Sequence, residues 1–162
     1  MSLLHLCRWL QNNSFIDLIN GTAWTAAALE IVHYFSMFII VGSMVIVDLR
    51  VLGLVGRRQD ATQFANRLFP WMWAALAFNF LSGFFMFAGS ATSYYGNSIF
   101  YDKVIVILFA IVASILVQQK VRKWDQLPAV PVWAKLLALV SICLWVGAII
   151  AGVEVPALTG VG

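Results

Sequence analysis

The sequence predicts an all-α fold, namely an integral membrane bundle of four transmembrane helices with an N-terminal interfacial amphipathic helix. Of its 162 residues, 62% are hydrophobic and only 10% are charged, whereas soluble domains have about 45–50% and about 25%. The hydrophobic residues are gathered in four long stretches that contain few charges. So few charged side chains could not cover a soluble globule, and we therefore expect lipid to be the solvent of most of this surface.

The four apolar stretches give the expected spans of a single membrane domain over residues 1–162. They lie near residues 23–48, 69–91, 102–120 and 133–155, each close to the roughly 20 residues that cross a hydrocarbon core. Lys103 and Lys120 flank the short third stretch and can extend it, because lysine side chains reach toward the headgroups. The runs are continuous rather than alternating, which favours helices over the strands of a membrane barrel.

Residues 1–20 are expected to form the interfacial helix. Leu3, Leu6 and Leu10 recur at helical spacing, which is typical of a helix that lies on a membrane surface. Ser14, with Asp17 three residues later, resembles a capping box that would start a second short helix.

The positions of the basic residues predict the orientation of the chain. Only Arg8 and Lys103 lie on the side of the termini, whereas eight basic residues lie in or beside the two connections on the other side: Arg50, Arg57, Arg58, Arg67, Lys120, Arg122, Lys123 and Lys135. By the positive-inside rule, both connections are expected in the cytoplasm and both termini outside it. The net charge of +3 does not indicate a nucleic-acid partner, because no polar surface carries it.

Ionisable residues inside the spans are the candidates for function, because each costs about 2.5–3.5 kcal/mol in hydrocarbon and should face the bundle interior. In the first span, Glu30, His33, Met37, Met44 and Asp48 recur at steps that place them on one helix face. We therefore expect this face to line the interior, with the methionines acting mainly as packing residues.

A polar site is predicted in the outer half of the membrane. The rise of about 1.5 Å per residue brings Glu30 and His33 to the depth at which the third span starts and the fourth ends. We expect a ligand or proton site that combines Glu30, His33, Asn79, Lys103 and Glu154. Lys103 would be the counter-ion of one of its carboxylates.

Two further features of the spans are expected to be structural. Asp48 should pair with Arg50, or with another basic residue of the first connection, at the cytoplasmic boundary. The last span carries two pairs of small residues that permit close helix approach, Gly147/Ala151 and Ala148/Gly152.

The sequence offers few residues that could bind a metal or a haem. His33 with an opposing methionine, Met86 or Met72, is chemically allowed as a His/Met haem ligand pair, but no second histidine lies in a span. A single Glu-x-x-His motif does not make a di-metal site, and we predict no metal site. Because phosphate loops, nucleophile elbows and zinc spacings are absent from the sequence, we expect no catalytic residues and no enzyme activity. The cofactor stays unknown, with haem as the open option.

Several motifs resemble those of an uncharacterised bacterial family of small four-span inner-membrane proteins. They are Glu30-x-x-His33, Gly42, Asp48-Leu49-Arg50-x-x-Gly53, Ser82-Gly83 with Phe87-Ala88, and Asn97-x-x-Phe100-x-x-Lys103. The resemblance implies a multi-pass protein of the bacterial inner membrane, in which the charge pattern puts both termini in the periplasm, and it marks Glu30, His33, Asp48, Arg50 and Lys103 for testing. The shape is loosely similar to four-helix membrane cytochromes and copper-resistance membrane proteins, which carry several ligand histidines where this chain has one.

Three functional hypotheses follow. The first is a non-catalytic membrane subunit or binding module, open to a redox-linked role, whose Glu30/His33 pocket holds a cofactor, a lipid or quinone headgroup, or a partner helix. The second is an oligomeric proton-coupled small transporter that uses Glu30. The third is an assembly protein whose polar cluster only fixes helix register. The expected partners are the lipid bilayer and either other membrane subunits or a second copy in a homodimer.

Overall fold

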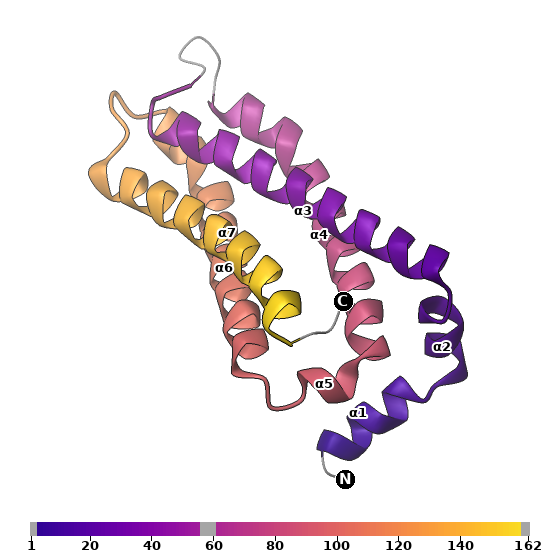
Figure 1. The fold of residues 1–162 in the computed structure, drawn as a ribbon. Helices are drawn as coiled ribbons and strands as arrows, with labels where there is room; N and C mark the ends of the chain where they lie inside the picture. Colours follow the sequence, from indigo (N-terminus) through magenta and orange to yellow (C-terminus); the bar gives the residue numbers. More distant parts are fainter. Residues whose placement is uncertain (1–2, 56–60, 160–162) are drawn as a thin grey trace.

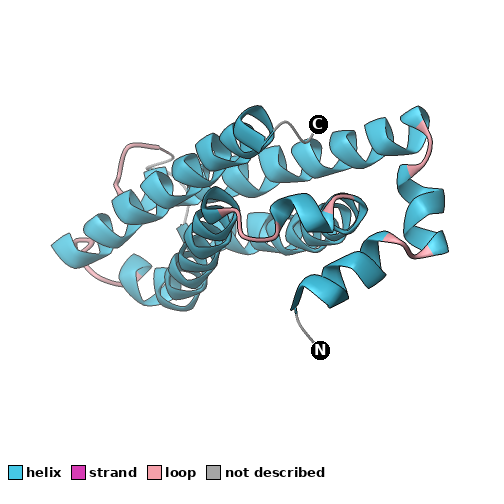
Figure 2. Cartoon of the chain, turned by 60° about the horizontal axis from the view of Figure 1, so that its bottom comes forward, coloured by secondary structure: helices cyan, strands magenta, loops and turns pink. Residues whose placement is uncertain are grey.

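The computed structural model describes the backbone of residues 3–55 and 61–159 and the side chains of residues 3–55 and 62–152. In these ranges the chain contains helices and loops but no strands (Figures 1 and 2). The helices are α1 (Leu3–Gln11), α2 (Ser14–Asn20), α3 (Ala23–Val51), α4 (Ala61–Gly89), α5 (Ala91–Tyr94), α6 (Ser98–Asp125) and α7 (Val132–Thr159).

Four of these helices, α3, α4, α6 and α7, are long and apolar enough to cross a membrane. This confirms the all-α four-helix prediction and indicates a multi-pass membrane protein. The helices extend beyond the predicted limits, since α4 begins at Ala61 rather than near residue 69 and α6 continues to Asp125. Apolar composition marks only the part of a helix inside hydrocarbon, whereas the polar turns at its ends remain helical in the headgroup region.

The four long helices form two antiparallel pairs. α3 packs along α4 and α6 packs along α7, and the pairs are joined mainly where α3 meets α7. In Figure 1 the pairs converge at the upper left and separate toward the lower right. We call the converging end, with Val51, Ala61, Asp125 and Val132, the closed end, and the opposite end the open end.

The hydrophobic core lies toward the closed end. Its largest fully buried apolar side chains are Ile40, Met44, Val47, Met72 and Val117. The first buried residue of α3 is Ser36 and the first of α6 is Ala110. The open-end thirds of these two helices therefore pack loosely in the described structure.

Specific caps fasten the closed end. Gly53, at φ +80°, ends α3 in a Schellman motif, in which Leu54 N donates to Leu49 O and Gly53 N donates to Arg50 O, both at 3.0 Å. Asp125 of α6 caps the start of α4, because its Oδ2 accepts from Thr62 N at 3.0 Å and from Thr62 Oγ1 at 2.9 Å.

The N-terminal segment lies across the open end as two short helices rather than one (Figure 2). α2 begins at Ser14, but Asn13 is its cap, since Asn13 Oδ1 accepts from Phe15 N at 2.9 Å. The expected capping role of Ser14 is therefore wrong. Asn20 Nδ2 donates to Phe85 O of α4 at 3.1 Å and holds α2 on the bundle. The exposed apolar side chains of the two helices are Leu3, Leu6, Trp9, Phe15 and Leu18.

Candidate functional site

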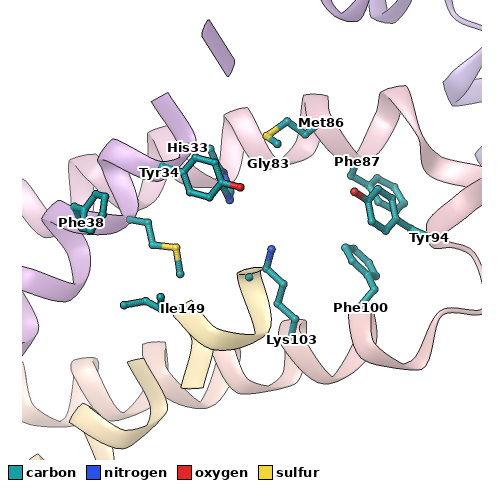
Figure 3. A pocket seen from close by; sticks show the side chains of 12 residues that line it. His33, Tyr34, Phe38, Gly83, Met86, Phe87, Tyr94, Phe100, Lys103 and Ile149 are labelled. Atoms are coloured by element: carbon teal, nitrogen blue, oxygen red, sulfur yellow. The ribbon is translucent and has the colours of Figure 1, made fainter. Parts of the chain in front are cut away.

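A cavity of about 190 Å³ lies between α3, α4, α6 and α7 toward the open end (Figure 3). Its polar side chains are His33, Tyr34, Tyr94 and Lys103, and the other lining residues are apolar or aromatic. Two basic groups thus share a small space with aromatic walls.

The His33 ring is held in place by α4. Its Nδ1 lies 3.1 Å from the backbone oxygen of Asn79 and 3.1 Å from Ser82 Oγ. A carbonyl oxygen can only accept a hydrogen bond, so Nδ1 carries the hydrogen and Nε2 keeps the lone pair of the neutral ring. Histidines that bind metals or ligands are commonly oriented in this way, by a bond from the second ring nitrogen.

A compact polar network joins α3 to α4 around His33. Asn79 Nδ2 donates to His33 O at 2.8 Å and to Ser36 Oγ at 3.2 Å. Ser82 Oγ donates to Phe78 O at 2.8 Å, so its hydrogen is used within α4. Because His33 Nδ1 already carries a hydrogen, it cannot activate Ser82 as a nucleophile, and this contact fixes the ring rather than forming a catalytic pair.

Lys103 enters the cavity from α6. Asn97 caps this helix, since its Oδ1 accepts from Ile99 N at 3.0 Å, and Gly96 supplies the left-handed turn before it with φ +79°. Figure 3 shows the Lys103 amine directed across the cavity toward the His33 ring. Among the described residues the half-buried Lys103 has no hydrogen-bond or ion-pair partner.

Aromatic rings close the open-end side of the cavity. The rings of Phe87 and Phe100 are stacked with their centroids 5.4 Å apart, and Tyr94 lies 5.0 Å from Phe100. Burial raises the pKa of the Tyr94 phenol, and the nearby Tyr34 raises it further. Tyr94 therefore stays a neutral hydrogen-bond donor at physiological pH.

A second hollow, of about 660 Å³, lies between α4 and α6 and adjoins the cavity. Five residues line both spaces: His33, Gly83, Phe87, Phe100 and Lys103. On the closed-end side, Trp73 Nε1 donates to Gln118 Oε1 at 3.0 Å and ties the two helices together. We call the space between this tie and the Phe87–Phe100 stack the α4–α6 window.

The structure brings together some of the predicted site residues. His33 and Lys103 share the cavity, and Asn79 bonds to the α3 backbone beside His33. Glu30 is exposed and does not line the cavity, so the expectation that it faces the interior is wrong. Glu30 lies in the part of α3 that precedes its first buried residue, Ser36. Glu154 belongs to the α7 backbone, and its side chain lies outside the described residues.

The expected ion pair between Asp48 and Arg50 is also wrong. Asp48 is fully buried and its carboxylate oxygens make no hydrogen bond in the part of the chain that is described, whereas Arg50 Nη1 donates to Val55 O at 3.4 Å. Residues two positions apart project from different sides of a helix, which prevents the pairing. Ser141 of α7 lies beside Asp48, but its Oγ makes no hydrogen bond in the described structure.

The residues expected for haem share one cavity. His33 and Met86 both line it, whereas His5 is exposed on α1 and lines a separate surface hollow. The described side chains contain no group of three or more His, Cys, Asp or Glu that could hold a metal ion.

Sequence reasoning missed the aromatic part of the site. Tyr34, Tyr94 and Phe100 were not predicted to belong to it, although all three line the cavity. A signal for Phe100 was present, because its three-residue spacing from Lys103 places both side chains on one face of α6.

The model of a family of unknown function, DUF6644, matches residues 8–156. The chain belongs to the DUF6644 family. No curated protein and no solved structure matches this DUF6644 chain. The family match agrees with the expected resemblance to an uncharacterised family, and the site residues His33 and Lys103 lie within the matched range.

Proposed function

We propose that this DUF6644 protein is a non-catalytic binding module of the bacterial inner membrane. Its His33–Lys103 cavity would hold the anionic group of a ligand in the outer half of the bilayer. The observation that carries the proposal is Lys103, a half-buried cation without a described hydrogen-bond or ion-pair partner in an aromatic cavity.

The energetics of a membrane cation support this assignment. A lysine inside hydrocarbon costs a few kcal/mol and is usually paired or functional. A bound anion would supply the missing charge partner, and Tyr94 could donate a further hydrogen bond. Binding rather than catalysis is favoured because Ser82, the hydroxyl beside His33, is not activated by the ring.

The depth of the cavity suits a ligand that arrives from the outer leaflet. At about 1.5 Å per residue, Lys103 lies about 25 Å along α6 from Lys120, close to the thickness of a hydrocarbon core. With the basic closed end in the cytoplasm and the termini in the periplasm, the cavity comes near the outer headgroups. The proposed partners are the lipid bilayer and a second membrane subunit or a second copy of the chain, and not nucleic acid.

A thermal unfolding experiment tests the anion site. Hexanoate, added to protein purified in a neutral detergent, is expected to raise the apparent Tm, and hexylammonium, with the same chain and opposite charge, is not. A ligand at about 100 times its Kd stabilises by about 2.7 kcal/mol. The effect should be absent in Lys103→Met and largely kept in Lys103→Arg. Equal stabilisation of wild type and Lys103→Met by hexanoate would show that the proposal is wrong.

A redox-linked role is the second candidate, and the orientation of His33 favours it. Nδ1 is bonded to the Asn79 carbonyl, which leaves Nε2 for a ligand, and Met86 lines the same cavity. Optical spectra of the oxidised and dithionite-reduced protein test this role. A Soret band that disappears in His33→Ala would establish haem and overturn the anion site. The transporter alternative has less support, because Glu30 is exposed and does not line the cavity.

A further inference from the structure

We infer that the ligand is an amphiphile, with an anionic head at Lys103 and a hydrocarbon tail that lies in the α4–α6 window. This inference rests on the proposed anion site and adds the class of ligand and its route. The ligand would enter sideways from the surrounding lipid, rather than from water.

The window has a defined frame. The Trp73–Gln118 hydrogen bond bounds it toward the closed end and the Phe87–Phe100 stack bounds it toward the open end. Trp73 and Phe87 are about 21 Å apart along α4, which is long enough for an extended acyl segment. The volume of about 660 Å³ falls in the range of about 300–1,000 Å³ that is typical of ligand sites.

The lining of the window is hydrocarbon-like. Leu76, Ala77 and Phe80 of α4 face Ile107, Leu108 and Ile111 of α6 across it. Ala77, Phe80 and Leu108 are exposed, so this side of the window opens to the outside of the bundle. Away from His33 and Lys103, which lie where the window meets the cavity, its polar groups are Trp73 and Asn79, and both are hydrogen-bonded to neighbouring helices. A hydrocarbon tail that extends away from Lys103 therefore meets apolar or hydrogen-bonded groups.

The charged side chain of Lys103 lies where the window meets the cavity, which is where the head of an amphiphile would bind. Lys103 and His33 line both the window and the cavity, so a head bound in the cavity is continuous with a tail in the window. The Phe87, Tyr94 and Phe100 rings pack together on the open-end side, and the window gives the cavity an apolar opening between α4 and α6. Lys103, which has no hydrogen-bond or ion-pair partner among the described residues, would select an anionic head over a zwitterionic or neutral one.

Photo-crosslinking in nanodiscs of phosphatidylcholine tests the inference. One sample receives a sixteen-carbon fatty acid with a mid-chain diazirine, and a second receives phosphatidylglycerol that carries the same labelled chain. We expect adducts on the window segments 76–84 of α4 and 104–111 of α6. The yield should fall by about tenfold in Lys103→Met and recover in Lys103→Arg. Ala77→Phe, which fills the window, should also remove the adducts, whereas Ala74→Phe, an equally exposed alanine of α4 outside the window, should not.

The outcomes separate the two proposals. Crosslinking from only one probe supports the inference and identifies the source of the head as a free acid or a phospholipid. Adducts that depend on Lys103 but lie outside the window, with a yield that Ala77→Phe does not change, would show that the tail site is wrong. Such adducts would still support the anion site at Lys103. Adducts that are unchanged in Lys103→Met overturn both proposals. Monodisperse size-exclusion profiles and apparent Tm values close to that of the wild type would show that each variant is folded.

Discussion

Gly83 of α4 lies against the ring of His33 of α3 so closely that a Cβ at position 83 would be 2.9 Å from His33 Cε1. Real Cβ atoms do not tolerate such a contact, so the ring would have to shift. The absence of a side chain at position 83 therefore allows the ring to reach Asn79 O and Ser82 Oγ. Gly83 is a positioning residue for the cavity.

Gly83→Ala should displace the His33 ring and destabilise the protein by about 1–2 kcal/mol, because overpacking exceeds the gain in helix propensity. Gly42→Ala is the matched control, since a Cβ there meets nothing within 4 Å, and it should stabilise by about 0.5–1 kcal/mol. The measurements are the apparent Tm and the NMR signal of the His33 ring. An unchanged His33 signal in Gly83→Ala would contradict this role.

Lys103→Met should stabilise the ligand-free protein by about 1–2 kcal/mol, because it removes a cation that has no partner among the described residues from apolar surroundings. The same variant should lose the response to hexanoate, so stability and binding would change in opposite directions. Lys123→Met, at an exposed position of α6, should change stability by less than about 0.5 kcal/mol. A lower Tm of ligand-free Lys103→Met would indicate that the lysine has a structural partner.

Asn79→Ala should weaken the contact between α3 and α4, because Asn79 Nδ2 donates both to His33 O and to Ser36 Oγ. Interhelical hydrogen bonds in membranes contribute about 0.6 kcal/mol on average and up to about 1.7, so we expect a loss of about 1–2 kcal/mol. Asn66→Ala, an exposed amide of the same helix, is the control. The measurement is the apparent Tm of each variant. Equal changes in Asn79→Ala and Asn66→Ala would show that the hydrogen bonds of Asn79 do not stabilise the protein.

Asp48→Asn should leave stability unchanged or raise it by about 1 kcal/mol, measured as the apparent Tm. Asp48 is fully buried and its carboxylate oxygens accept no hydrogen bond in the described structure, so ionising it has no compensating interaction. Asp102→Asn, at an exposed position, should have no effect. A strong loss of stability in Asp48→Asn would show that the carboxylate itself is required.

The number of spans could be predicted from the sequence because long uncharged stretches have few alternatives to a membrane helix. The presence of His33 and Lys103 in one cavity could also be predicted, because helical rise sets the depth of each residue along its span. The exposure of Glu30 was not predictable. The periodicity of one helix gives the direction of a side chain, but whether another helix lies opposite depends on where the pairs separate.

The closed-end polar residues show a second limit. Asp48 and Arg50 have complementary charges, yet their separation by two positions directs them to different sides of α3. The groups that do meet, Asp48 and Ser141, come from helices far apart in the sequence. Only the packing of α3 against α7 brings them together.

The two contacts that bound the window also determine where α4 and α6 can move apart. Between the Trp73–Gln118 bond and the Phe87–Phe100 stack, no described hydrogen bond joins α4 to α6. The helices can bow apart over this stretch against dispersion forces alone. The lateral pressure and chain order of the bilayer thus become part of the energetics of the site, and its occupancy should vary with the lipid composition of the membrane.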